Sequence, residues 1–228
     1  MTTMHDDGRR TALVLVDPYR DFLSEGGRIW PRVREVAERV GLHQHLRDLL
    51  TAVRAAGLPV FVAPHRRYRP GDVDGWVHAS RAHRVLRDNR FYEVGTFGGE
   101  WHPDFAPRPG DVVSSEHWGA DGFAHTDLDQ QLRQHGIEHI VLAGMTAPGC
   151  VEGTGRHGME LGYAITLVKD ATAAFSWEHL RAAVDLNGPI YAGAVLTTQQ
   201  VIDGLAAGVD RPRAPVGASR PTSTPRTV

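Results

Sequence analysis

The sequence contains one cysteine, one lysine and no long apolar run, and each scarcity excludes a class of protein. A single cysteine cannot form a disulfide within the chain, which favours a reducing cytoplasm. No stretch approaches the roughly eighteen apolar residues of a membrane-spanning helix, and residues 1–10 lack the apolar core of a signal peptide. A formal net charge of −2 indicates no attraction to nucleic acid or to an anionic membrane. We therefore expect a cytoplasmic protein that binds neither.

The remaining composition is that of an ordinary globular protein. Apolar residues make up 41% and charged residues 23%, and 228 residues are enough for one α/β domain with a sizeable core. We expect this domain at residues 11–207, after a flexible N-terminus at 1–10. Residues 208–228 are rich in proline, arginine, serine and threonine, so a disordered tail is expected there.

Short apolar runs alternate with helical patterns along the expected domain. Runs that are apolar on both faces indicate parallel strands covered by helices on both sides. We therefore predict a three-layer α/β/α sandwich of the doubly wound, Rossmann-like class, with a six-stranded parallel sheet and a ligand site at the carboxyl ends of the strands. The strand-like runs are residues 11–17, 58–64, 110–115, 138–144 and 163–170, and a short run after Pro189.

The segment 64–109 is too long for an ordinary connection between a strand and a helix. It carries scattered aromatic residues and little periodicity. Exposed aromatic residues in a long loop typically cover a ligand or a partner, so we predict a lid or a subunit contact in a homo-oligomer. An irregular satellite core is the alternative. The aromatic residues are Tyr68, Trp76, Phe91, Tyr92, Phe97, Trp101 and Phe105.

Two strand ends carry candidate catalytic residues. Asp17 ends the first strand, and the following Pro18 favours an extended conformation at Asp17. Cys150 lies past a Pro-Gly turn after the fourth strand, in the first turn of a helix. The free N–H groups and positive dipole end of a helix lower a thiol pKa and bind an oxyanion. This position favours a nucleophile over the alternative, a small buried apolar side chain.

Four segments together resemble the isochorismatase-like cysteine hydrolase superfamily: LVLVDPYRDF, GFAHTDLDQQL, GIEHIVLAGMTAPGCVEGTGRHGMELGY and VKDATAAF. The resemblance spans roughly residues 11–205 and implies a sheet in the order 3-2-1-4-5-6, with the first and fourth strands adjacent. It also implies hydrolysis of a small molecule. Members include amidohydrolases, which cleave C–N bonds through a cysteine thioester, and isochorismatases, which cleave a vinyl ether.

The amidohydrolase members use an Asp–Lys–Cys triad, and two of its residues have counterparts here. Asp17 matches the aspartate, which serves as general base and then general acid, and Cys150 matches the cysteine. The resemblance further implies a cis peptide bond between Met145 and Thr146. This bond would direct the backbone N–H groups of Thr146 and Cys150 at the oxyanion.

The triad lysine has no counterpart. Counting forward from residues 110–111 places its position at Glu116, whereas counting back from residues 123–126 places it at His117. Lys169 follows the fifth strand and is expected to be a solvated charge. Because a positive charge stabilises both a thiolate and an ionised carboxylate, His117 is the more plausible substitute, and Glu116 would act in the opposite direction.

No metal or other cofactor is expected. The nicotinamidase branch binds a metal through an Asp-x-His…His cluster after the second strand, and His65 lacks those companions. The predicted function is an amidohydrolase with a small-molecule substrate. A vinyl-ether hydrolase is one alternative, although that reaction needs Asp17 and no thiol, so the presence of Cys150 argues against it. A non-catalytic relative that binds a ligand or partner is the other, because the lysine is missing.

Overall fold

Six parallel strands form the centre of the computed structural model, which describes residues 10–209. They lie in the order β3-β2-β1-β4-β5-β6, which confirms the predicted fold class and the strand order implied by the resemblance. The strands are β1 (Thr11–Val16), β2 (Val60–Ala63), β3 (Val112–Val113), β4 (His139–Met145), β5 (Ala164–Ala173) and β6 (Ala194–Leu196).

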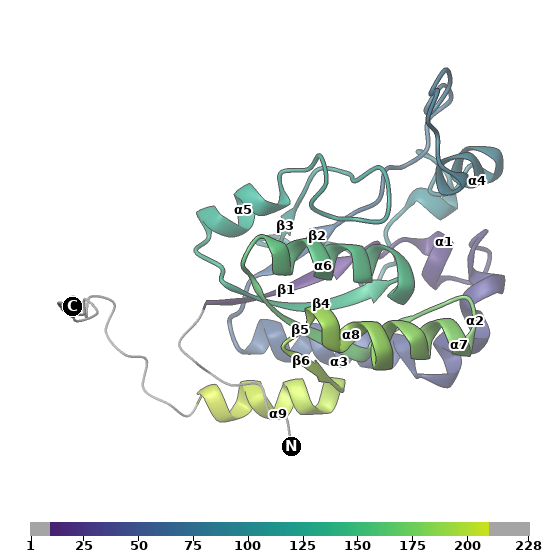
Figure 1. Cartoon of the computed structure of the whole chain (residues 1–228). Coiled ribbons are helices and arrows are strands. Elements are labelled where there is room, and N and C mark those ends of the chain that lie inside the picture. Colours follow the sequence, from purple (N-terminus) through teal and green to yellow (C-terminus); the bar gives the residue numbers. More distant parts are fainter. Residues whose placement is uncertain (1–9, 210–228) are drawn as a thin grey trace.

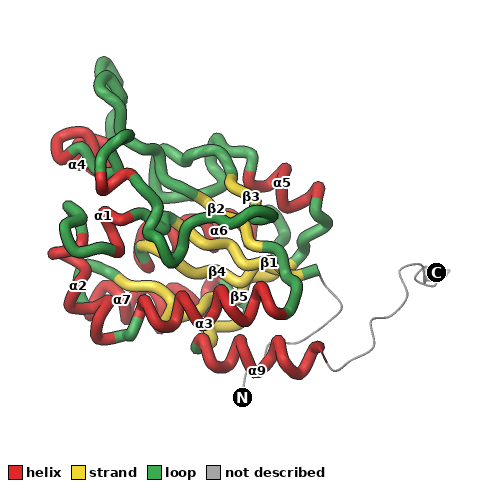
Figure 2. Tube along the Cα trace, turned by 180° about the vertical axis from the view of Figure 1, so that it is seen from behind, coloured by secondary structure: helices red, strands yellow, loops and turns green. Residues whose placement is uncertain are grey.

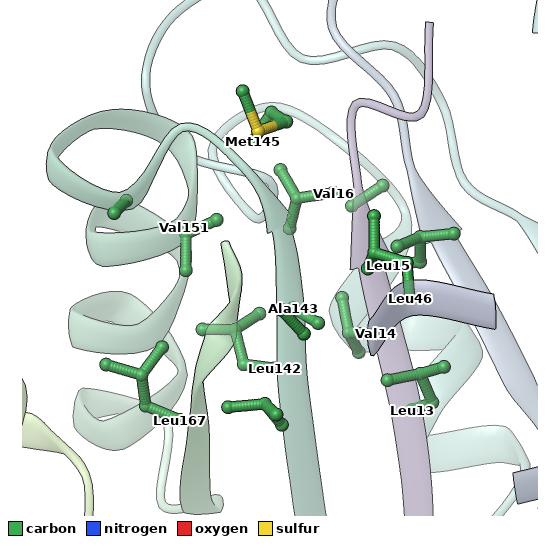
Figure 3. Close-up of a cluster of buried hydrophobic side chains, with 14 of the residues drawn as sticks. Leu13, Val14, Leu15, Val16, Leu46, Leu142, Ala143, Met145, Val151 and Leu167 are labelled. Atoms are coloured by element: carbon green, nitrogen blue, oxygen red, sulfur yellow. The ribbon is translucent and has the colours of Figure 1, made fainter. Parts of the chain in front are cut away.

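Strand β1 lies at the centre of the sheet beside β4, and five of its six residues are buried. Val14 pairs with Phe61 of β2 on one side and with Leu142 of β4 on the other, and all three side chains are fully buried. Figure 3 shows the apolar side chains of β1 and β4 between Leu46 from one helical layer and Val151 from the other. Burial on both faces explains why these strands read as continuous apolar runs in the sequence.

Helices cover both faces of the sheet, as Figures 1 and 2 show from opposite sides. One layer holds the helices on the α3 face, and α3 packs on both α9 and β5. The other layer holds the helices on the α6 face, where Arg133 of α5 donates a hydrogen bond to the Leu161 carbonyl at the end of α6. The first layer is α2 (Trp30–Arg39), α3 (Leu42–Ala55) and α9 (Thr198–Val209), and the second is α5 (Leu128–Gln134), α6 (Glu152–Glu160), α7 (Trp177–Arg181) and α8 (Gly188–Tyr191).

The segment 64–109 is only partly exposed. Phe91, Tyr92 and Phe105 are buried in the main core, whereas Trp76 and Phe97 are each 42% exposed. The part between β2 and α4 projects from the domain (Figure 1). These buried side chains are part of the main core. A lid or subunit contact stays a prediction for the projecting part of the segment. Besides α4 (Arg81–Asn89), the segment contains the short turn η1 (Phe97–Gly99).

Three short elements, α1 (Arg20–Leu23), η2 (Ala147–Val151) and η3 (Ala182–Asn187), complete the structure of residues 10–209. Helix α9 continues to Val209, two residues into the predicted tail. Residues 1–9 and 210–228, which hold most of the two predicted flexible ends, lie outside the described residues. Within residues 10–209, no helix combines the length and apolar character needed to cross a bilayer.

Gly144 allows the ends of β1 and β4 to approach closely. Its φ is +117°, and a Cβ atom built there would lie 2.2 Å from the Val16 carbonyl oxygen. Val16 is the last residue of β1 and immediately precedes Asp17. The contact between these two backbones therefore sets the spacing of the strand ends that carry the candidate catalytic residues.

Replacing Gly144 with alanine is expected to lower the free energy of unfolding by about 3 kcal/mol or more, because a positive φ and a backbone collision both oppose the new methyl group. Gly162→Ala is the matched control, since Gly162 has a φ of +94° but open space around a built Cβ. This control should lose only about 1–2 kcal/mol. Urea unfolding followed by circular dichroism measures both, and equal losses would show that close approach at Gly144 contributes nothing.

Candidate active site

Asp17 is fully buried where β1 ends, and its backbone conformation differs from the prediction. Its φ is +51°, in the left-handed region, whereas Pro18 predicted an extended conformation. Its N–H donates to the Ala63 carbonyl at 3.2 Å, and its carbonyl accepts from Tyr19 at 2.7 Å. These two bonds hold the chain in a turn that costs about 1–3 kcal/mol at a residue other than glycine. The turn directs the carboxylate into the protein.

The pairing between β2 and the chain that continues from β3 shifts by one residue, and this shift decides which residue faces Asp17. Val113 of β3 pairs with Val62 of β2, but further along it is His117, and not Glu116, that pairs with His65. The chain between β3 and this bridge therefore holds one residue more than a regular ladder. Because successive side chains of a strand point to opposite sides, this extra residue turns His117 inward.

His117 is fully buried, and each of its ring nitrogens has a hydrogen-bond partner. Its Nε2 atom lies 3.1 Å from Asp17 Oδ1, and its Nδ1 atom lies 2.8 Å from the Gly119 carbonyl oxygen. Burial lowers the pKa of His117, but the charge of Asp17, the hydrogen bond to it and the Gly119 carbonyl outweigh burial, so the pKa is raised above its ordinary value. A protonated His117 satisfies both acceptors at once.

Cys150 brings its sulfur to the same point from the end of β4. It lies in η2, directly after the strand, and its side chain is half-buried. The Sγ atom, a carboxylate oxygen of Asp17 and a ring nitrogen of His117 all lie within 4.8 Å of one another. The Gly119 carbonyl that accepts from His117 is also 3.8 Å from Sγ. Three residues singled out from the sequence therefore meet in one cluster.

The state of the thiol differs from the sequence expectation. Burial, followed by the charge of Asp17, raises the pKa of Cys150 well above its ordinary value. The backbone groups of Cys150 and Thr146 act against this rise in pKa without overcoming it. The expected lowering of the pKa by a helix terminus is thus wrong for the free protein. The resting residue is a neutral thiol beside a carboxylate.

The Met145–Thr146 peptide bond is cis, as the resemblance implies. Met145 is fully buried and Thr146 is 5% exposed, so both residues belong to the floor of the site. Thr146 and Cys150 lie at the two ends of the turn that follows β4. The oxyanion hole that the resemblance implies for their backbone N–H groups stays a prediction.

Glu116, the other candidate for the lysine position, points away from the cluster. Its Oε1 accepts from Arg67 Nε at 2.6 Å, and its Oε2 lies 3.5 Å from Arg66 Nη1. Arg66 is also held by both carboxylate oxygens of Asp72. Glu116 therefore belongs to an ion-pair network at the rim. The lysine, Lys169, is an exposed residue on β5.

Sequence reasoning missed the residues that hold Asp17 and His117 in place. The backbone N–H of His65 donates to Asp17 Oδ1 at 2.6 Å, and the Tyr19 hydroxyl donates to the His65 carbonyl at 2.9 Å. Burial and then the charge of His117 lower the pKa of His65 to about 4, so its ring is neutral. His65 immediately follows β2 and Pro64, beside the end of β1. The position of His65 at the end of the strand next to β1 was the sequence feature that could have identified it as a site residue.

Aromatic residues form one wall beside the cluster. The Tyr19 ring stacks on Trp101 at 4.7 Å with a 6° interplanar angle and on Tyr92 at 5.2 Å. Burial and the Asp17 charge raise the pKa of Tyr19, so its hydroxyl stays protonated and able to donate. Tyr92 and Trp101 both come from the segment 64–109. This segment therefore contributes to the site through packed side chains.

Comparison with known proteins identifies similar sequences and similar folds. The profile of the Isochorismatase domain family matches residues 11–200. Ureidoacrylate amidohydrolase RutB of Pantoea ananatis is 27% identical over 207 residues, which cover 86% of this chain and 82% of that protein. RutB of Caulobacter vibrioides is also 27% identical, over 84% of this chain and 89% of that protein.

Solved structures show the same fold. N-carbamoylsarcosine amidase from Thermoplasma acidophilum superimposes with a TM-score of 0.64 at 29% identity, covering 83% of this chain and 96% of that one. A cysteine hydrolase from Pseudomonas syringae pv. phaseolicola gives a TM-score of 0.74 at 25% identity, covering 87% and 93%.

The raised pKa of Cys150 predicts how the thiol responds to alkylation. In the wild type, the pH midpoint of the rate with iodoacetamide should lie above that of an ordinary cysteine. Asp17→Asn should move the midpoint downward, because it removes the negative charge that opposes thiolate formation. Rates measured by intact mass across a pH series test this, with the urea-unfolded protein as the reference. A midpoint that rises in Asp17→Asn would contradict the assignment.

Proposed function

Because the chain belongs to the isochorismatase family, we propose that it is a cysteine amidohydrolase that cleaves a C–N bond of a small molecule through a thioester at Cys150. The observation that carries this proposal is that Asp17 after β1, Cys150 after β4 and His117 in the chain beyond β3 meet with their reactive atoms within 4.8 Å of one another. The relatives named for ureidoacrylate and N-carbamoylsarcosine support urea-type carbonyl compounds as the substrate class.

The first step uses the carboxylate as a base. Asp17 Oδ2 is buried and has no hydrogen-bond partner, which leaves it available to accept the thiol proton. The sulfur then attacks the substrate carbonyl carbon, and the C=O electron pair moves onto oxygen. The thiolate therefore forms as it attacks, which accords with the raised pKa of the resting thiol.

The tetrahedral intermediate meets groups that are already in place. Its oxyanion lies beside the backbone N–H groups of Thr146 and Cys150, in the turn that carries the sulfur. When the C–N bond breaks, the proton held by Asp17 passes to the leaving nitrogen, so an amine or ammonia departs uncharged. The acyl group stays on Cys150 as a thioester, and Asp17 is ionised again.

The same carboxylate serves the second half of the reaction. A water molecule gives a proton to Asp17 and its oxygen attacks the thioester carbonyl, and the same two N–H groups stabilise the second oxyanion. Collapse of this intermediate breaks the C–S bond and returns the proton to sulfur. The products are the acid and the free thiol, so the enzyme ends in its starting state.

His117 takes the place of the triad lysine in this scheme. Its raised pKa reflects a positive charge held against Asp17, at the place where the lysine would supply one. The charge also favours the developing thiolate. A histidine differs from a lysine in losing its charge at much lower pH.

We place the proposed enzyme in the reducing cytoplasm, because its mechanism requires a free thiol and Cys150 is the chain's one cysteine. We also expect a homo-oligomer. The projecting part of segment 64–109 carries Trp76, which is 42% exposed, and Val77, which is 87% exposed. Apolar side chains in such a position favour contact with another subunit.

Turnover of a substrate panel should separate the proposed function from its alternatives. The panel contains ureido and carbamoyl acids, simple amides and isochorismate. Cys150→Ala and Asp17→Asn should each lower kcat/KM on the active amide-type compound by at least about 1,000-fold, because each removes a reacting group. Intact mass of the wild type with a slow substrate should reveal an acyl adduct that Cys150→Ala lacks.

The other outcomes are equally informative. If Cys150→Ala keeps full turnover while Asp17→Asn loses it, the vinyl-ether mechanism replaces the thioester mechanism. If the wild type turns over no compound and forms no adduct, the chain is a binding protein without catalysis.

Substitutions at His117 test the source of the positive charge. His117→Gln should lower kcat/KM by about 10- to 100-fold, whereas His117→Lys should keep most activity. The wild-type rate should fall as pH rises through the raised pKa of His117, because the imidazolium loses its charge there, and His117→Lys should move this fall to higher pH. Glu116→Gln is the control and should change the rate less than about threefold. The opposite ranking would assign the lysine role to Glu116.

A further inference from the structure

The replacement of the triad lysine by His117 changes what the three side chains can hold. A lysine ammonium has three donors and no lone pair, whereas an imidazole nitrogen can bind a metal ion. Carboxylate, imidazole and thiolate are the three protein ligand types of zinc. Within residues 10–209, Asp17, His117 and Cys150 form a group whose potential ligand atoms all lie within 4.8 Å of one another.

The distances suit a small tetrahedral ion. Ligand bonds of about 2.0–2.3 Å place tetrahedral ligands roughly 3.3–3.7 Å apart. His117 Nε2 and Asp17 Oδ1 are 3.1 Å apart, and the sulfur lies within 4.8 Å of both residues' ligand atoms. A rotation of the Cys150 side chain toward Asp17 and His117 would bring the sulfur closer to an ion held by the other two residues.

A second observation points independently to a bound cation. Asp17 Oδ2 is buried, its residue is 0% exposed, and it accepts no hydrogen bond. Its sister atom Oδ1 accepts from the His65 N–H and contacts His117, so the carboxylate is fixed in orientation. A buried carboxylate oxygen without a partner is costly, and a cation or a proton donor satisfies it.

The surroundings of His117 match those of a metal-ligating histidine. Its Nδ1 atom lies 2.8 Å from the Gly119 carbonyl, which fixes the ring and leaves Nε2 directed at Asp17. Ligating histidines almost always donate their second ring N–H to such a carbonyl or carboxylate. Nε2 therefore carries either a proton shared with Asp17 or a metal ion in the same place.

We propose that Asp17, His117 and Cys150 bind one zinc-like transition-metal ion, which inhibits the enzyme by occupying the Cys150 sulfur. The thiol proton of Cys150 and the Nε2 proton of His117 both leave to solvent when sulfur and nitrogen bind the ion. Three protein ligands leave a fourth position for water. Metal binding does not depend on the proposed function, whereas the inhibition rests on the proposed function. The sequence expectation of no metal considered only the segment after β2, whereas these ligands come from three strand ends.

Cobalt titration of the metal-free full-length protein tests binding directly. Co²⁺ bound to a thiolate gives a near-ultraviolet charge-transfer band, so the wild type should show this band with one equivalent bound, and Zn²⁺ should abolish it. Cys150→Ser should lose the band. Competition with a chromogenic chelator should show Zn²⁺ affinity at least about 100-fold weaker in Cys150→Ser, Asp17→Asn and His117→Lys.

Two controls isolate the site. His157→Gln removes a different histidine–carboxylate pair, in which Nδ1 lies 2.6 Å from Asp121 Oδ2, and should leave cobalt binding unchanged. His117→Lys keeps a positive charge but has no ligand nitrogen with a free lone pair when protonated. One equivalent of Zn²⁺ should inhibit the wild type, and EDTA should restore its turnover.

The outcomes distinguish failure of this inference from failure of the proposed function. A wild type without the charge-transfer band, or a His117→Lys variant with unchanged zinc affinity, overturns the metal site. Turnover that persists in the zinc-saturated wild type overturns the inhibition. If no compound in the panel is turned over, the cobalt spectrum still decides whether the site binds metal.

Discussion

The structure of the site depends on the burial of one carboxylate. Asp17 has no exposed surface, and taking an unpaired charge out of water costs several kcal/mol. Its partners therefore have to be supplied by the neighbouring strands. The His65 N–H comes from the end of β2, and the His117 ring comes from the chain beyond β3. The remaining oxygen is left for whatever approaches from the end of β4, where Cys150 lies.

The same burial explains why the helix terminus does not ionise Cys150. The dipole at a helix end is worth about 0.3–1 kcal/mol, and up to about 2 kcal/mol in partly buried sites. Desolvation of a thiolate costs several kcal/mol, and Asp17 adds a like charge in contact. Desolvation and the charge of Asp17 together outweigh the helix dipole, so Cys150 is a neutral thiol. Activation then requires transfer of the proton to Asp17 during attack, which couples nucleophile and base more tightly than a preformed thiolate would.

The sequence was sufficient to predict the strands that are buried on both faces. The apolar runs of β1 and β4 and the polar residues that follow them identified Asp17 and Cys150, and the resemblance supplied the strand order. It was not sufficient to choose between Glu116 and His117. The two counts disagreed because the chain beyond β3 contains one extra residue relative to β2, and no local pattern marks that residue. The left-handed turn at Asp17 was missed for a similar reason, since tertiary hydrogen bonds override the preference set by Pro18.

The exchange of lysine for histidine makes the positive charge depend on the carboxylate that it supports. A lysine beside Asp17 would be charged with or without the aspartate, because its ordinary pKa is far above neutral. His117 is buried, and burial alone lowers its pKa; the charge and hydrogen bond of Asp17 are what raise it. Removing Asp17 therefore removes the base and also discharges His117. The contributions of these two residues to catalysis and to stability are consequently not additive, and the pair functions as one unit.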